Sequence, residues 1–220
     1  CTKELRPGKY YLKESKTIDG YVLNETEYDF EIVAGDNLTP IVKVDLGNIS
    51  NEPTKVDFVK TDIETGQPIK GVAFELYDTE GNKLYSWMSE TTPHRINALP
   101  QGEYILKEVE TVYGYLLHSS EIRFTVENTA DVQTVKVDNQ PIKGTASLYK
   151  TDGETQNPLS GFEFGVYARE DIVTLDGTVR AAKDELVDTI ITDGEGMART
   201  KELYLGKYYF KEHKAAYGYL

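Results

Sequence analysis

The chain has 220 residues, of which 39% are hydrophobic and 28% charged, a balance typical of folded proteins and not of disordered chains. Its 37 acidic and 24 basic residues give a net charge of -13, whose field repels phosphate backbones and anionic lipids, so we expect no nucleic acid partner and no membrane contact in this segment. The single cysteine, Cys1, permits no internal disulfide and no thiolate pair for a metal, and we expect no metal site and no cofactor.

One block of sequence occurs three times along the chain. It reads LRPGKYYLKESKTIDGYVL from Leu5, LPQGEYILKEVETVYGYLL from Leu99 and LYLGKYYFKEHKAAYGYL from Leu203. Each occurrence contains L-x-x-G-x-Y, then Lys-Glu, then Gly-Tyr. Such self-similarity indicates an array of related repeats.

Two further blocks open and close the repeats. The opening block reads VDFVKTDIETGQPIKGVAFELY from Val56 and ASLYKTDGETQNPLSGFEFGVY from Ala146, and the closing block reads KVDLGNISNEP through Pro53 and VKVDNQPIKG through Gly144. Only the central copy carries all three blocks. We therefore expect three copies: the C-terminal part of a domain at 1–53, a complete domain at 54–142, and the N-terminal part of a domain at 143–220 with an insertion near 168–183.

Each copy reads as short β-strands separated by turns. Residues 56–60 and 121–126 alternate apolar and polar side chains, and 80–82 is a turn signal. Residues 62–64 and 152–154 lack the spacing of a calcium loop and are predicted as hairpin turns. Only 181–187 could sustain a helical period. Repeats of about 90 residues built this way predict an all-β fold of tandem antiparallel β-sandwiches.

Strand phase places polar side chains on the core face, because residues two apart in a strand share a face. Lys60 is in phase with Val56 and Phe58, Glu108 with Tyr104 and Leu106, and Asn139 with Val135 and Val137. The corresponding residues of the other copies are Lys150, Glu14, Glu212 and Asn51. Desolvation lowers the pKa of a lysine and raises that of a glutamate, which would leave a neutral amine beside a neutral acid.

These three side chains could react with one another. A neutral amine is a nucleophile, and a protonated carboxyl can polarise an amide carbonyl. Attack of Lys60 on the side-chain carbonyl of Asn139, with Glu108 shuttling the proton, would expel ammonia and leave an amide crosslink between the first and last strands. The same residues also permit a buried ion pair without bond formation, or a lysine whose stem only covers the core edge.

The KTD opening, the Y-x-L-K-E…G-Y middle block and the N-x-P closing resemble the CnaB-type, or SpaA-like prealbumin, domains of Gram-positive surface adhesins and pilins over essentially the whole chain. The resemblance implies a seven-stranded sandwich, prealbumin-like or reverse immunoglobulin-like, with self-forming Lys-Asn or Lys-Asp isopeptide bonds. It makes Lys60 and Lys150 the reacting lysines, Glu14, Glu108 and Glu212 the catalytic acids, and Asn139 and Asn51 the acceptors.

The sequence departs from the family pattern near these residues. Asp138 and Asp45 are alternative acceptors, because a shift of register would exchange them with the asparagines. The glutamate of the middle block is followed by Val109, Ser15 or His213, where the family often has threonine.

We expect structural stalk or spacer repeats of a cell-surface adhesin or pilus and no turnover enzyme, because the indicated self-crosslinking runs once per domain. The expected partners are neighbouring repeats, and the expected location is extracellular, with cell-wall attachment through regions outside this segment. The alternative is an adhesin that contacts a host extracellular protein or glycan through the insertion, since functional segments often lie on loops of a rigid scaffold. Lys150 and Glu212 could also be completed by the closing strand of another chain.

Overall fold

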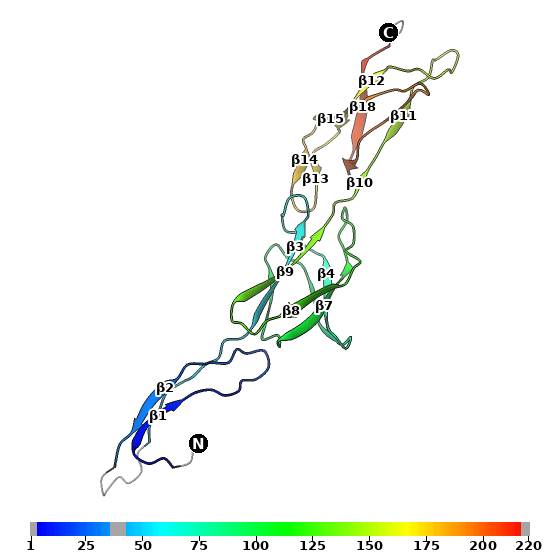
Figure 1. Ribbon diagram of the computed structural model, residues 1–220. Coiled ribbons are helices and arrows are strands. Elements are labelled where there is room, and N and C mark those ends of the chain that lie inside the picture. The colour runs from blue at the N-terminus through cyan, green and yellow to red at the C-terminus, as the bar shows by residue number, and fades with distance from the viewer. Residues whose placement is uncertain (1–3, 36–42, 217–220) are drawn as a thin grey trace.

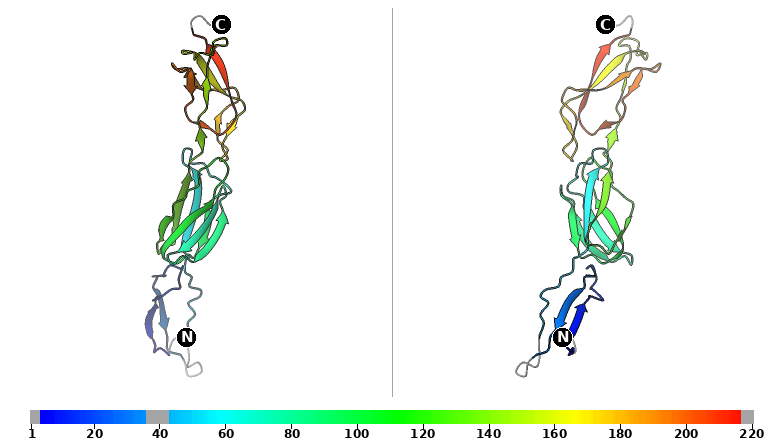
Figure 2. Two further views of the ribbon diagram at one scale, coloured as in Figure 1. Left: turned by 90° about the vertical axis from the view of Figure 1, so that its right-hand side faces the viewer. Right: turned by 60° about the vertical axis from the view of Figure 1, so that its left-hand side comes forward.

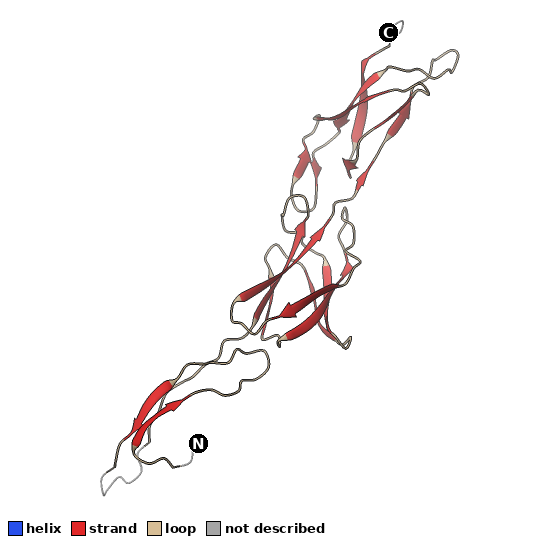
Figure 3. Cartoon of the chain, in the orientation of Figure 1, coloured by secondary structure: helices blue, strands red, loops and turns tan. Residues whose placement is uncertain are grey.

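The computed structural model describes residues 4–35 and 43–216. The three copies lie end to end in an elongated arrangement (Figure 1), and two further views show the same succession (Figure 2). Every regular element of the described residues is a β-strand (Figure 3), which confirms the all-β prediction. The described part of the chain includes no helix that could cross a bilayer. Cys1, Gly218 and Tyr219 lie outside the described residues.

The second copy is a sandwich of two sheets. Its strands are β3 (Lys55–Asp62), β4 (Ala73–Asp78), β5 (Lys83–Met88), β6 (His94–Asn97), β7 (Gly102–Glu110), β8 (Ile122–Val126) and β9 (Val132–Asn139). A three-stranded sheet has the order β6-β3-β9, and a four-stranded sheet has the order β5-β4-β7-β8. The strand number and the two layers agree with the expected sandwich.

The core of the second copy lies between these two sheets. Alternate side chains of β3 and β4 point into it, so Val56, Phe58, Phe74 and Leu76 are buried. The ring of Trp87 on β5 stacks on Phe74 with 5.6 Å between the ring centroids. Aromatic and β-branched side chains pack well on a pleated surface, which is why these sequences form strands.

The first and last strands of the second copy run parallel. β3 and β9 pair in register, with Lys60 beside Val137 and Asp62 beside Asn139. All other strand ladders among the described residues are antiparallel. Both strands start at the end that faces the first copy and finish at the end that faces the third (Figure 1). The chain therefore enters the sandwich at one end and leaves it at the other.

The first and third copies repeat parts of this architecture. In the first copy, β1 (Gly8–Leu12) pairs with β2 (Tyr28–Ile32) in the register of β7 and β8. The third copy contains β10 (Lys143–Gly144), β11 (Ser147–Tyr149), β12 (Glu163–Ala168), β13 (Ile172–Val173), β14 (Val179–Ala181), β15 (Leu186–Ile191), β16 (Met197–Arg199), β17 (Leu203–Tyr204) and β18 (Tyr208–Lys214). In it Phe164 pairs with Glu212 as Phe74 pairs with Glu108. The shared blocks of sequence thus form the same strand pairs.

The repeated L-x-x-G-x-Y sequence marks a tyrosine corner. In each copy the tyrosine hydroxyl donates a hydrogen bond to the carbonyl four residues earlier: Tyr10 to Arg6 at 2.8 Å, Tyr104 to Pro100 at 2.9 Å, and Tyr208 to Tyr204 at 2.9 Å. This bond fixes the turn at the start of β1, β7 and β18.

The possible helix at 181–187 is wrong. Ala181 ends β14 and Leu186 begins β15, and between them Asp184 takes a positive φ of 63° in a turn. Ala181 pairs with Ile172 across the β13–β14 hairpin, so its backbone is engaged in a sheet. Pairing within the insertion overrides the local periodicity.

Candidate functional site

Three strands of the second copy bring Lys60, Glu108 and Asn139 together. Lys60 lies on β3, Glu108 on β7 of the opposite sheet, and Asn139 at the end of β9. Lys60 Nζ is 3.2 Å from Glu108 Oε2, and Asn139 Nδ2 is 2.6 Å from Glu108 Oε1. The side chains of Lys60 and Glu108 are 1% and 0% exposed. The cluster is therefore shielded from solvent inside the sandwich.

Strand register explains how these side chains meet. In the parallel β3–β9 pair, Lys60 pairs with Val137 and Asp62 pairs with Asn139. Asn139 therefore lies two residues beyond the partner of Lys60, and side chains two residues apart in a strand share a face. Within the facing sheet, Glu108 of β7 pairs with Phe74 of β4, directly after a register shift between Ala73 and Phe74. The polar groups thus face one another across the end of the core that is nearest the third copy.

Hydrogen bonds hold the amide of Asn139 in place. Its Nδ2 donates to Glu108 Oε1 and, at 3.0 Å, to Thr111 Oγ1, while Lys60 Nζ donates to the carbonyl of Val137 at 3.4 Å. Among the buried side-chain atoms of the described residues, Glu108 Oε2 and Asn139 Oδ1 are those without a hydrogen-bond partner, although Oε2 lies within ion-pair distance of Lys60. Buried polar atoms are rarely left unpaired, so this cluster is energetically unusual.

Burial dominates the ionisation of Lys60. It lowers the pKa of the ammonium group by more than the nearby carboxylates of Glu108 and Asp138 raise it. A lowered pKa increases the fraction of neutral amine, which is the nucleophilic form of lysine. The arrangement can therefore present an amine, a proton acceptor and an amide carbonyl in one dry space.

Asp138, the alternative acceptor, makes different contacts. It accepts a hydrogen bond from Thr61, and its Oδ1 lies 3.0 Å from the Nζ of exposed Lys136. Burial raises the pKa of Asp138, but the hydrogen bonds from Thr61 and Lys136, together with the positive charges of Lys136 and Lys60, outweigh burial and the net shift is downward. A charged carboxylate is a poorer electrophile than an amide, so the contacts favour Asn139 as the acceptor.

The first copy holds an acid and an acceptor in the same arrangement. Asn51 Nδ2 donates to Glu14 Oε2 at 2.6 Å and to Thr17 Oγ1 at 3.1 Å. An open groove of about 480 Å³ lies beside them, lined by Glu14, Lys16, Thr17, Ile18, Tyr21 and Asn51. Residues 1–53 do not include the opening block, which supplies the lysine in the second copy. Asp45 is the alternative crosslinking residue of this copy. Its Oδ1 accepts a hydrogen bond from the backbone N–H of Gly47 at 2.9 Å.

The third copy holds a lysine and an acid. Lys150 Nζ lies 3.2 Å from Glu212 Oε2, but the two side chains are 31% and 32% exposed. Lys150 also lies over the ring of Phe162 at 4.9 Å from the centroid. Residues 143–220 do not include the closing block with its asparagine. Among the described residues, all three types of side chain meet in the second copy.

Sequence reasoning missed the threonine that holds the amide. Thr111 and Thr17 each lie three residues after the glutamate, in the sequences KEVET and KESKT, and each accepts a hydrogen bond from the asparagine. The third copy has Ala215 at this position. The repeated E-x-x-T was therefore a usable signal that strand periodicity could not supply.

The acidic turns at 62–64 and 152–154 are hairpin turns, as predicted. The N–H of Asp62 donates to the carbonyl of Gln67, and that of Asp152 to the carbonyl of Asn157, both at 2.9 Å. Within the described residues, no group of three or more His, Cys, Asp or Glu side chains could hold a metal ion.

Comparison with known proteins identifies the fold. The family model described as "SpaA: Prealbumin-like fold domain" matches residues 1–47, 54–141 and 144–220. Among solved structures, the Bacillus anthracis TIE protein is similar to the chain at 24% identity with a TM-score of 0.60, over 96% of this chain and 37% of that one. The chain thus spans little more than a third of that protein, and the likeness shows a shared fold.

Two pilins are also similar. A streptococcal ancillary pilin matches at 24% identity with a TM-score of 0.37, covering 98% of this chain and 69% of its own. The minor pilin GBS52 of Streptococcus agalactiae matches at 23% identity with a TM-score of 0.36, covering 64% of this chain and 63% of its own. No curated protein sequence matches the chain.

Proposed function

Because the chain belongs to the SpaA prealbumin-like fold domain family, we propose that it is part of an extracellular stalk in a surface adhesin or pilus. The copies at 1–53, 54–142 and 143–220 serve as successive spacer domains, and their partners are neighbouring repeats. The second copy is stapled by an isopeptide bond between Lys60 and Asn139. Attachment to the cell wall takes place through regions outside this segment.

The single observation that supports the staple most strongly is the buried cluster of Lys60, Glu108 and Asn139. A charged pair inside a protein costs several kcal/mol of desolvation, and its attraction offsets that cost only when every polar atom is bonded. Here Glu108 Oε2 and Asn139 Oδ1 lack hydrogen bonds. Conversion of the ammonium and the primary amide into a secondary amide would remove the buried charge.

The reaction begins with transfer of a proton from the Lys60 ammonium to Glu108, which gives a neutral amine and a neutral acid. The amide of Asn139 can turn about its terminal bond, exchanging its oxygen and nitrogen, so that protonated Glu108 donates to the carbonyl oxygen. Lys60 Nζ attacks Cγ, and the tetrahedral intermediate collapses with breakage of the bond from Cγ to Nδ2. The amine proton passes through Glu108 to the departing nitrogen, and ammonia leaves.

The staple suits a stalk because of where tension enters the second copy. Pulling along the chain draws the start of β3 toward the first copy and the end of β9 toward the third, which shears the parallel pair. A bond from Lys60 to Asn139 carries that force directly from β3 to β9. The remaining five strands then lie outside the path of the force.

The adhesin alternative receives less support. Two charged side chains of the insertion, Arg180 and Asp176, point toward the second copy and are 7% and 0% exposed. Groups that are already bound within the chain are not available to a host protein or glycan. Enzymatic turnover is not part of the proposal, since the staple forms once per copy.

Intact mass spectrometry tests the staple. A chain of residues 1–220 is expected to be lighter than its sequence by one ammonia, because these residues include one complete set of the three reacting groups, that of the second copy. Lys60→Ala and Glu108→Gln should both restore the full mass, the first by removing the nucleophile and the second by removing the proton shuttle. Peptide mapping should show the segments around Lys60 and Asn139 joined.

Matched controls are Lys136→Ala on β9 and Glu103→Gln on β7, two exposed residues that should leave the deficit unchanged. A wild-type chain of full mass would rule out the staple and leave the buried ion pair. A deficit of one water in place of ammonia would assign the acceptor to Asp138, because a Lys-Asp condensation releases water.

A further inference from the structure

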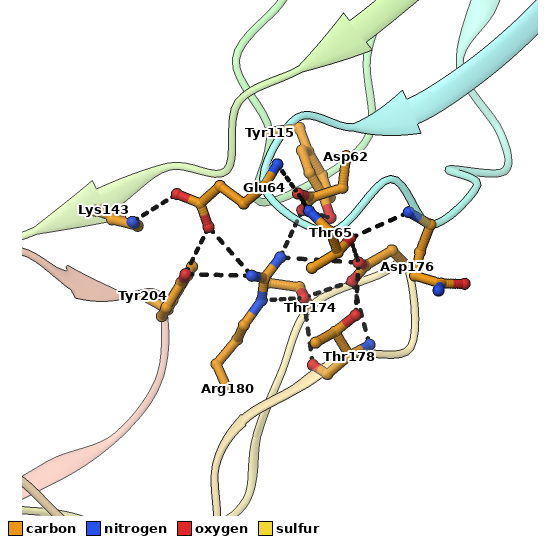
Figure 4. A network of polar contacts seen from close by, with 11 residues as sticks. Asp62, Glu64, Thr65, Tyr115, Lys143, Thr174, Asp176, Thr178, Arg180 and Tyr204 are labelled. Carbon is orange, nitrogen blue, oxygen red and sulfur yellow. Dashed lines mark hydrogen bonds and ion pairs between the residues drawn. The ribbon is translucent and has the colours of Figure 1, made fainter.

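The inserted segment of the third copy reaches back onto the second copy. In the second copy the turn between β4 and β5 is short, whereas in the third copy residues 169–185 join the equivalent strands and form the β13–β14 hairpin. Figure 4 shows side chains of this hairpin meeting the loop that follows β3. We propose that the β13–β14 hairpin is an interdomain clamp that fixes the second and third copies as one stiff unit, with Arg180 at its centre.

Arg180 bonds two carboxylates of the second copy. Its Nη2 donates to Asp62 Oδ2 at 2.6 Å, and its Nη1 donates to Glu64 Oε2 at 3.1 Å. The guanidinium carbon also lies 4.6 Å from the ring centroid of Tyr204. Arginine suits such a site because its rigid, planar group presents several donors at once.

Asp176 makes a second contact from the tip of the hairpin. Thr65 of the second copy donates to its Oδ2 at 2.8 Å, and Thr178 donates to the same oxygen at 2.7 Å. Burial raises the pKa of Asp176, but hydrogen bonds from Thr174, Thr178 and Thr65 outweigh it and lower the pKa to about 2. The carboxylate therefore stays charged across the physiological range.

A third set of contacts centres on Glu64. The hydroxyl of Tyr204 donates to Glu64 Oε2 at 2.5 Å, and Lys143 Nζ donates to Oε1 at 2.7 Å. Three elements of the third copy thus converge on one loop of the second: the hairpin, β17 and the connection at β10. Such a joint resists both bending and twisting, because its contacts surround the point where the chain passes from the second copy to the third.

The receiving loop is already shaped before the clamp binds. Asp62 Oδ1 accepts from the backbone N–H groups of Glu64 at 2.7 Å and Thr65 at 3.0 Å. Asp152 Oδ1 accepts in the same way from Glu154 and Thr155, in the matching turn of the third copy. The turn is thus a property of the opening block, and the hairpin uses a preformed surface. Preorganisation reduces the entropy lost on docking.

The joint between the first and second copies is built without such a clamp. Thr54 donates from its backbone N–H to the carbonyl of Gly20 at 2.9 Å and from its hydroxyl to the carbonyl of Leu99 at 2.6 Å. Gly20 has a φ of +83°, and a Cβ there would collide with the carbonyl of Ala98. Backbone contacts at this joint are accompanied by the hydrogen bond from the Thr54 hydroxyl to the Gly20 carbonyl at 3.3 Å and by a surface ion pair of 3.1 Å between Lys55 and Glu52, while the inserted hairpin with its buried charges belongs to the other joint.

The clamp does not depend on the Lys60–Asn139 staple, and it can be tested separately. In the full chain, residual dipolar couplings of the second and third copies should fit one common alignment. Arg180→Gln should abolish the common alignment while each copy keeps its own internal couplings. Arg169→Gln, an exposed arginine at the start of the same insertion, should leave it intact.

A paired change on the other side of the joint guards against damage to the hairpin itself. Glu64→Gln combined with Thr65→Val leaves the third copy's sequence unchanged and should also separate the two alignments. Independent alignment of the two copies in the wild-type chain would overturn the proposal. So would a common alignment that survives both Arg180→Gln and the paired change.

Discussion

The second and third copies hold the same lysine–glutamate pair at the same separation in different surroundings. Lys60 and Glu108 are 3.2 Å apart and essentially unexposed, whereas Lys150 and Glu212 are 3.2 Å apart and about one-third exposed. In the second copy β9 lies beside β3, while in the third copy the described residues place only β16 beside β11. The closing strand therefore buries the pair as well as supplying the acceptor.

This difference shows how the proposed chemistry can be confined to a finished fold. Without the closing strand, water reaches the lysine, and the desolvation that favours a neutral amine is lost. When the strand pairs, it removes the water and delivers the amide in the same step. The pKa of Lys60, which the closing strand covers, is lowered by burial. Reaction before folding is thereby avoided.

The largest expected effect comes from replacing each pair with neutral side chains of similar size. If Lys60 and Glu108 form only an ion pair, Lys60→Met with Glu108→Gln should change stability little, because buried pairs often exchange neutrally for well-packed neutral groups. If the staple forms, the same change should cost about 4–5 kcal/mol, since it opens a loop spanning most of the domain. The loss in the free energy of unfolding of the second copy is measured by denaturant unfolding, with amide hydrogen exchange in β3 as the readout.

The matched change in the third copy is Lys150→Met with Glu212→Gln. A half-exposed pair contributes about 0–1 kcal/mol, so this variant should unfold almost as the wild type does. Equal losses from the two double variants would contradict the difference between the copies. A negligible loss in the second copy would favour the ion pair over the staple.

The sequence predicted the inward-facing lysine, glutamate and asparagine because strand phase is a local property. Lys60, Glu108 and Asn139 each share a face with apolar neighbours two residues away, and that pattern alone placed them inward. It could not show that β3 and β9 run parallel, since pairing direction depends on where the chain enters and leaves the sandwich. The possible helix at 181–187 failed for a related reason, because the insertion folds onto itself as a hairpin.

Contacts between copies were beyond the reach of local patterns. Arg180 and Asp62 are 118 residues apart in the sequence. No periodic pattern around either residue indicates that the two side chains contact each other. The sequence predicted an insertion near 168–183, but the docking of this segment depends on the relative placement of two domains, which no local pattern encodes. Thr111 was missed because it lies just past the end of β7, where strand phase no longer applies.

A smaller effect is expected from Thr111, which sharpens the contrast with Ala215 of the third copy. Thr111→Val removes the oxygen that accepts from Asn139 Nδ2, so the amide is held less firmly against Glu108. Loss of one hydrogen bond of about 1 kcal/mol should slow staple formation roughly five- to tenfold without abolishing it. Intact mass followed over time after cell-free synthesis gives the rate.

Thr111→Ser serves as the control because it keeps the hydroxyl, and it should react at nearly the wild-type rate. Staple formation that is as fast in Thr111→Val as in Thr111→Ser would show that the threonine does not position the amide. Complete loss of the staple in both variants would point to disturbed folding near the end of β7.

The smallest effect concerns stability at acid pH. The two copies carry different residues at one position of the opening block, directly before Phe58 in the second copy and directly before Leu148 in the third. Asp57 accepts two hydrogen bonds of 2.7 Å from Arg95, whereas the third copy has Ser147 there. The hydrogen bond from Arg95 is the main cause of the lowered pKa of Asp57. A lowered folded-state pKa gives stability that is complete above the unfolded value of 3.8 and is lost as the pH falls through the folded value.

Asp57→Asn should therefore destabilise the second copy at pH 7, by no more than about 1 kcal/mol because the pair is partly open to solvent. The difference between this variant and the wild type should shrink as the pH falls below about 4, since protonated Asp57 no longer gains from Arg95. Ser147→Asn in the third copy should show no such dependence. A constant difference from pH 7 to pH 2 would mean that Asp57 acts through packing alone, and the electrostatic contrast between the two copies would then lie wholly in the two lysine–glutamate pairs, one buried and one partly exposed.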